Sequence, residues 1–173
     1  MAVVTDNTRA EHDATKALDN PLWIYAVKQY QQTGCAQFLL RAQDEMGLEV
    51  NILLFAGWLA SRNQSLNLKA ITDSGAHNWQ QDVIKPLREI RRQVKNYRQE
   101  GFYRQILALE LSAEQQQLEV LYELRDKMPK EQENFAQNVR LSCEEYFKGK
   151  NTKLQESWLQ TLIKHLQPNR LGT

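Results

Sequence analysis

Hydrophobic residues recur along most of the chain at spacings of three and four, and strict alternation of apolar and polar residues is nowhere sustained. This period is typical of α-helices. Only 7 glycines and 4 prolines interrupt it in 173 residues. The pattern therefore predicts an all-α fold, a single-domain bundle of about six to eight helices.

The first three helices are marked by their boundary residues and their apolar faces. Asn20-Pro21 predicts a helix start, because Asn caps helices and proline in the first turn loses no hydrogen bond. A second helix is expected over residues 35–46, ended by Gly47. The third, over residues 50–60, is apolar on all faces, as in a helix surrounded by neighbours. We therefore expect it at the centre of the bundle; it is too short for a bilayer, which needs about 20 residues.

The rest of the chain divides at turn-forming residues and at a proline. Residues 61–75 hold Asn, Ser, Asp and Gly and predict a partly packed loop, followed by a short helix around Trp79 and Val83. Pro86 lacks an N–H and crowds the preceding turn, so a break or kink is expected there. The pattern then predicts an amphipathic helix to about Arg98 and further helices over residues 102–128, 130–147 and 152–167.

The two ends of the chain differ from its middle. Residues 1–18 are polar and mixed in charge, so we expect a disordered or frayed N-terminal arm without the apolar stretch of a secretory signal. The helical domain is expected to span residues 19–167, and residues 168–173 form a C-terminal tail. Only two cysteines occur, Cys35 and Cys143, with no paired motif. This usage favours a cytoplasmic protein over one with a disulfide framework.

A basic face on the helix after Pro86 is the sharpest polar feature. At about 100° per residue, its apolar residues fall within an arc of about 80°. An adjoining arc of about 120° holds Arg88, Arg91, Arg92, Lys95 and Arg98. Residues 85–104 carry a local charge of +5 in a chain whose net charge is +1. This face could hold phosphates or an acidic partner. Alternatively, it pairs with residues 105–147, whose local charge is −5.

A second polar cluster joins the second and third predicted helices. Gln43, Asp44 and Asn51 bring amide and carboxylate groups together, so a catalytic carboxylate or a small-ligand site is one hypothesis. The other is structural, with Asn51 capping the apolar helix, Gly47 ending the previous helix, and Asp44 accepting from nearby backbone N–H groups.

Motifs of established chemistry are missing from the sequence. No Gly-x-Ser-x-Gly, Gly-x-Gly-x-x-Gly or Gly-x-x-x-x-Gly-Lys occurs. The three histidines lie in different segments, without the spacing that suggests zinc. We therefore expect a protein that is not an enzyme, with no catalytic residues, no metal and no cofactor.

The middle of the chain resembles a family of small, uncharacterised, mostly proteobacterial proteins. The resemblance covers roughly residues 20–115. Its elements keep their order: Pro21-Leu22-Trp23, Tyr30, Gly34, Gln43-Asp44, Gly47, Val50-Asn51, Leu53-Leu54-Phe55, Trp58-Leu59-Ala60, Trp79, Val83, Pro86-Leu87-Arg88, Arg92 and Ala113-Glu114. It implies a helical cytosolic protein from a domain family of unknown function, with no catalytic residues to transfer.

Three functions follow as hypotheses. The leading one is a non-enzymatic interaction or regulatory module that binds a protein partner through the basic helix over residues 85–98. The alternative is an RNA- or DNA-binding module that uses the same basic face. The third is a small-ligand protein or enzyme with a polar site around Gln43, Asp44 and Asn51. No membrane insertion is expected, and a spare apolar stripe could join a homodimer.

Overall fold

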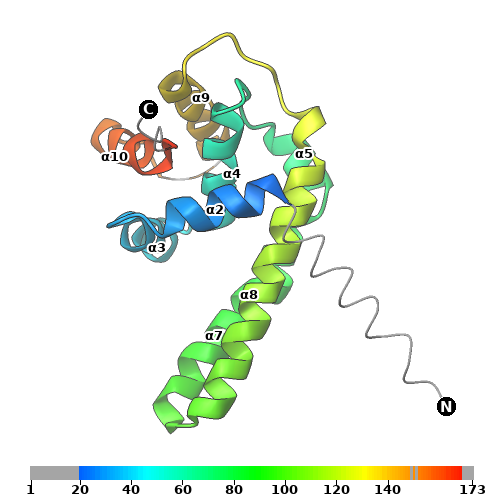
Figure 1. Ribbon diagram of the computed structural model, residues 1–173, viewed down its shortest axis with the longest axis vertical. Helices are drawn as coiled ribbons and strands as arrows, with labels where there is room; N and C mark the ends of the chain where they lie inside the picture. The colour runs from blue at the N-terminus through cyan, green and yellow to red at the C-terminus, as the bar shows by residue number, and fades with distance from the viewer. Residues whose placement is uncertain (1–19, 149, 151, 169–173) are drawn as a thin grey trace, which may run out of the picture.

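The computed structural model describes residues 20–148, 150 and 152–168, and within them the fold is an all-α single-domain bundle (Figure 1). The predicted N-terminal arm and residues 169–173 of the predicted tail lie outside the described residues. The helices are α2 (Pro21–Tyr30), α3 (Cys35–Met46), α4 (Val50–Ala60), α5 (Leu68–Asp73), α6 (Ala76–Trp79), α7 (Lys85–Val94), α8 (Glu100–Glu123), α9 (Phe135–Phe147) and α10 (Glu156–Leu166). The prediction of an all-α fold is confirmed.

The boundaries of the first helices follow from the residues that mark them. The Asn20 side chain accepts hydrogen bonds from the backbone N–H groups of Leu22 and Trp23, at 2.9 and 3.3 Å. Gly47 ends α3 in the left-handed conformation, with φ of 64°, where a side chain would be strained. The predicted start of α2 and the predicted ranges of α3 and α4 are confirmed.

Helix α4 is the centre of the fold, as its apolar faces predict. Every residue from Asn51 to Ala60 is buried, and α2, α3, α8, α9 and α10 all pack against this helix. Gly57 lets two of these neighbours approach closely, because a Cβ there would lie 2.8 Å from the Cβ of Leu166. The Tyr25 hydroxyl, which donates to the Leu166 carbonyl, also lies beside Gly57.

Helix α7 and the first part of α8 form a hairpin that projects from this body (Figure 1). We call residues 85–116 the hairpin. A 3-10 turn, Lys95–Tyr97, and Arg98 in the left-handed conformation, with φ of 54°, connect its two helices. Helix α7 therefore ends at Val94, whereas the amphipathic pattern predicted a helix to about Arg98.

The sequence predicts a break or kink at Pro86, and the helix is not broken there. Helix α6, a π-helical segment (Gln80–Ile84) and α7 follow one another with helical backbone dihedrals at each junction. Proline removes one backbone donor and crowds the turn before it, and a wider π turn can accommodate both effects. Pro86 lies at the start of α7, directly after this wider segment.

Other boundaries also differ from the sequence pattern: α8 ends at Glu123 and not at residue 128, and α10 begins at Glu156 and not at residue 152. The predicted loop over residues 61–75 contains α5, capped by the Asn67 side chain. Helix α9 begins at Phe135 and not at residue 130, because the preceding segment is held in an extended form by backbone contacts. Among these, Glu131 donates to the Asn63 carbonyl, and Ser65 donates to that of Pro129.

Candidate functional site

Two of the five predicted basic residues form an ion-pair cluster inside the hairpin. Arg88 donates to Glu110 and to Glu114, both at 2.8 Å. Arg91 donates to Glu110 as well and contacts the Tyr103 hydroxyl at 3.4 Å. The side chains of Arg88, Arg91 and Glu110 are only 12%, 22% and 6% exposed. These arginines are therefore occupied by carboxylates of α8, as the alternative of internal pairing proposed.

In this ion-pair cluster, burial and oppositely charged neighbours have opposing effects on the pKa of Arg91 and of Glu114. The hydrogen bond to Glu110 raises the pKa of Arg91, which stays charged. Burial raises the pKa of Glu114, and the neighbouring Arg88 opposes that shift. The cluster joins α7 to α8 through charge-assisted hydrogen bonds between largely buried side chains.

Arg92 connects the basic face to the second predicted site. Its guanidinium donates to Asp44 at the end of α3, at 2.8 Å, and both side chains are about half exposed. This hydrogen bond lowers the pKa of Asp44. The two predicted sites, which lie 48 positions apart at this contact, therefore meet where the end of α3 contacts the last turn of α7.

Lys95 and Arg98 lie at the exposed end of the hairpin. Neither forms an ion pair with another residue in the part of the chain that the structure describes. With Arg92, which is half exposed, they are the basic residues of this face that remain accessible to a partner.

The predicted polar cluster does not converge on one point. Asn51 is buried and turned away from Asp44: its amide donates to the Gln117 side chain at 2.8 Å and to the Glu114 carbonyl at 3.3 Å. The interpretation of Asn51 as a helix cap is wrong, because α4 already includes Val50 and the cap position is Glu49. Asp44 pairs with Arg92, and within the described residues no backbone N–H donates to its carboxylate. Gln43 is partly buried in the last turn of α3.

Asn51 belongs to a buried network that the sequence pattern did not reveal. Gln117 donates to the Glu49 carboxylate at 3.2 Å, and the His77 ring lies 2.5 Å from the other oxygen of that carboxylate. Burial raises the pKa of Glu49, and the hydrogen bond with His77 opposes this shift. Residues 49, 77 and 117 come from three segments, so only the fold brings them together.

Exposed large hydrophobic residues concentrate on the hairpin. Of the ten in the described part of the chain, six lie between residues 90 and 111. They are Ile90 (43% exposed), Tyr97 (74%), Phe102 (52%), Leu107 (43%), Leu109 (55%) and Leu111 (47%). A two-helix hairpin has no further layer to cover such residues.

These side chains divide between two opposite flanks of the hairpin. At about 100° per residue, Leu107 and Leu111 lie next to Glu114 on α8 and face the same way as Arg92 and Lys95 on α7. We call this the basic flank. On α8, Leu109 and Phe102 lie on the flank opposite to Leu107 and Leu111. On α7, Ile90 and Tyr97 lie on the flank opposite to Arg92 and Lys95. We call these four residues the neutral flank.

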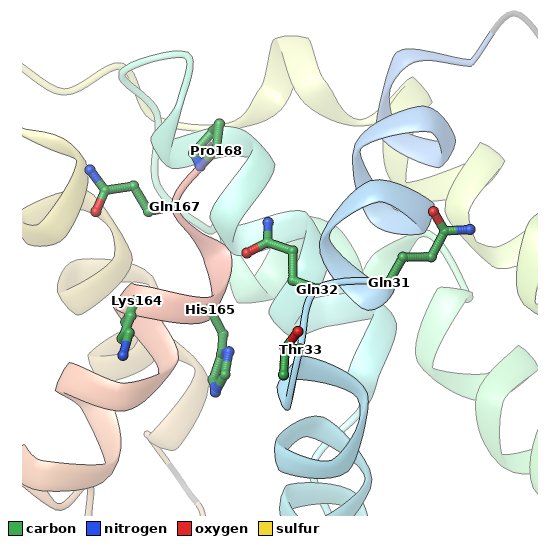
Figure 2. Close-up of a pocket in the computed structure, with 7 residues that line it drawn as sticks. All are labelled: Gln31, Gln32, Thr33, Lys164, His165, Gln167 and Pro168. Carbon is green, nitrogen blue, oxygen red and sulfur yellow. The ribbon is translucent and has the colours of Figure 1, made fainter. Parts of the chain in front are cut away.

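A separate hollow of about 690 Å³ lies between the turn that follows α2 and the end of α10. Figure 2 shows the turn with Gln32 and Thr33 on one side and Lys164 and His165, near the end of α10, on the other. Burial lowers the pKa of His165, and the nearby charge of Lys164 acts in the same direction. None of the residues predicted from the sequence lines this hollow.

Comparison with known proteins identifies a family and nothing more specific. A family model described as "Protein of unknown function (DUF2390)" matches residues 21–121. The chain belongs to this family. No match was found among curated proteins or among solved structures. The structure adds that residues carrying the resemblance touch one another: Asp44 contacts Arg92, Arg88 contacts Glu114, and the Trp79 indole donates to the Ala113 carbonyl.

The described residues contain neither a membrane-spanning helix nor a cluster of metal-binding side chains. None of the helices there is both long and apolar enough to cross a membrane. Over the same part of the chain, no three His, Cys, Asp or Glu side chains are grouped so that they could hold a metal ion.

Proposed function

We propose that this protein is a non-enzymatic interaction module that binds a protein partner through the basic flank of its hairpin. The observation that carries the proposal is the exposure of Leu107 and Leu111 beside Arg92 and Lys95 on an element that projects from the body. Apolar side chains bordered by accessible cations are suited to a partner segment with acidic and apolar residues.

The pairing of the arginines favours a protein over a nucleic acid. A nucleic-acid site needs several cations free to contact phosphates. Arg88 and Arg91 already bind the carboxylates of Glu110 and Glu114, which add negative charge to the same flank. Exposed leucines also contribute little to phosphate contacts, whereas they contribute directly to a protein interface.

The alternative of a catalytic or small-ligand site receives less support from the geometry. Asp44 is a half-exposed partner of Arg92, and Asn51 is engaged by Gln117 inside the protein. A shared site would require these groups to face one ligand. We further propose a cytoplasmic location in a bacterial cell, because Cys35 and Cys143 are free, buried thiols.

A capture experiment with charge-reversal variants tests the proposal. Tagged wild type is compared in native lysate with the variant Arg92→Glu/Lys95→Glu, each with and without nuclease. The matched control is Lys127→Glu/Lys153→Glu, which changes the net charge equally at exposed positions on the body. We expect a specific protein that survives nuclease, is lost with the hairpin variant and is kept by the control.

The captured protein is then purified and its affinity measured by calorimetry. Leu107→Ser should weaken binding at least about tenfold if this leucine lies in the contact. Capture that depends on nuclease-sensitive material assigns the basic flank to nucleic acid. Equal capture by wild type and by the hairpin variant excludes this flank as the interface.

A further inference from the structure

The neutral flank combines exposed apolar residues with an uncharged border. Ile90 and Leu109 lie at one level of the hairpin, and Tyr97 and Phe102 lie nearer its tip, since the two antiparallel helices pair around residues 91 and 110. At about 100° per residue, the polar side chains nearest to this flank are Gln93, Gln105, Ser112 and Gln116. None of these side chains carries a charge.

The size of this flank matches the apolar centre of a protein interface. Scaled by their exposed fractions, its four side chains present on the order of 500 Å² of surface. A specific interface buries about 800 Å² on each partner, with an apolar centre and a polar rim. Together with the surrounding glutamine and serine side chains, the four apolar residues reach the area that one partner buries in a specific interface.

We propose that the neutral flank binds the neutral flank of a second copy of this chain, so that two hairpins form a four-helix bundle. A two-fold axis perpendicular to the hairpin places the Tyr97–Phe102 level of each copy on the Ile90–Leu109 level of the other. The two levels differ by seven residues of α7, about 10 Å along the helix. Contacts of this kind are self-complementary, as a two-fold interface requires.

Charge distribution selects a second copy as the occupant. Two-fold pairing places identical surfaces against each other, which is unfavourable where a surface carries like charges. The neutral flank carries none at its centre, whereas pairing through the basic flank would oppose Arg92 and Lys95 of the two copies. The pairing also leaves the basic flank facing outward, so it does not depend on the function proposed above.

Sedimentation velocity over a wide range of concentrations tests this pairing with the full chain. We expect wild type to sediment with twice the monomer mass. Leu109→Glu should raise the dissociation constant of the dimer at least about tenfold, since it places a charge at the centre of the contact. The matched control is Leu107→Glu, two residues away on the basic flank, which should leave the dimer unchanged.

A distance measurement gives an independent readout without disturbing the apolar residues. Nitroxide labels at Gln105→Cys, on the neutral side of α8, should lie closer together across the dimer than labels at Leu107→Cys, by roughly two helix diameters or about 20 Å. The native cysteines are buried and should not take the label. A monomeric wild type, or dissociation by Leu107→Glu but not by Leu109→Glu, overturns the proposal.

Discussion

Asn51 and Asp44 carry similar polar groups in neighbouring positions of the sequence but lie in opposite environments. Asn51 is buried and donates to the side-chain oxygen of Gln117, whereas Asp44 is half exposed and pairs with Arg92. Removing one partner of a buried hydrogen bond leaves the other without compensation from water, at a cost of about 1–3 kcal/mol. An exposed ion pair contributes about 0–1 kcal/mol, because water screens it.

We therefore expect Asn51→Ala to lower the free energy of unfolding by about 1–3 kcal/mol and Asp44→Ala by less than about 1 kcal/mol. Urea denaturation followed by circular dichroism measures both. Gln117→Leu should cost more than Asn51→Ala, since it also removes the buried hydrogen bonds to Glu49 and to the Ala76 carbonyl. Equal effects of Asn51→Ala and Asp44→Ala would contradict the environments described here.

At the scale of elements, apolar spacing predicted the helices well and their boundaries less well. Capping residues such as Asn20 and Gly47 act locally, so the first three helices followed from the sequence. The start of α9 could not be predicted, because contacts from residues 63–65 hold the preceding segment extended. Continuity through Pro86 was missed for a different reason: the π turn that accommodates it has no clear sequence signal.

For the candidate site too, features within one helix could be predicted from the sequence, and contacts between distant segments could not. The basic residues of α7 share one helix, so their common face follows from a period of 3.6 residues. Their ion-pair partners lie on other helices, so Glu110 and Asp44 come close to this face only when α8 and α3 pack beside α7. The sequence therefore indicated which residues are basic and left open which of them remain free.

The ion-pair cluster makes Glu110 the residue on which the hairpin depends. Its carboxylate accepts from both Arg88 and Arg91, and all three side chains are largely buried. Removing one member of a buried pair costs about 3–5 kcal/mol, and here we expect about 2–3 kcal/mol because the arginines can turn toward water at the edge of the hairpin. Glu110→Ala should therefore open α7 locally.

Hydrogen exchange measures this loss element by element. Amide protection in α7 should fall in Glu110→Ala, while protection in α4 and α9 stays at the wild-type level. Glu89→Ala, on the exposed side of α7, is the control and should change neither. Loss of protection throughout the protein would mean that the hairpin and the body unfold as one unit.

At the scale of the whole molecule, α4 joins every layer of the body, so its side chains report on global stability. Leu54 is 3% exposed, in a helix packed against α2, α3, α8, α9 and α10. Truncating a buried leucine removes its apolar contacts and leaves a cavity, at a cost of about 2–5 kcal/mol. Leu54→Ala should lower the free energy of unfolding by that amount.

The two buried thiols provide a readout specific to the body. Burial raises the pKa of Cys35 to about 11 and that of Cys143 to about 12, so both are protonated and unreactive in the folded protein at pH 8. Labelling by a thiol reagent then requires unfolding. Leu54→Ala should speed labelling of both cysteines about 30-fold or more, whereas Glu110→Ala, which opens only the hairpin, should not.

The pH dependence of this labelling separates unfolding from direct reaction. An unfolded thiol has a pKa of about 8.5, so a labelling rate set by the equilibrium population of unfolded protein should rise with pH up to that value and then level off while stability is unchanged. Direct attack by the folded thiols would keep rising toward pH 11 to 12, where their own thiolates form. A continued rise in wild type would show that the core around α3 and α9 admits the reagent without unfolding.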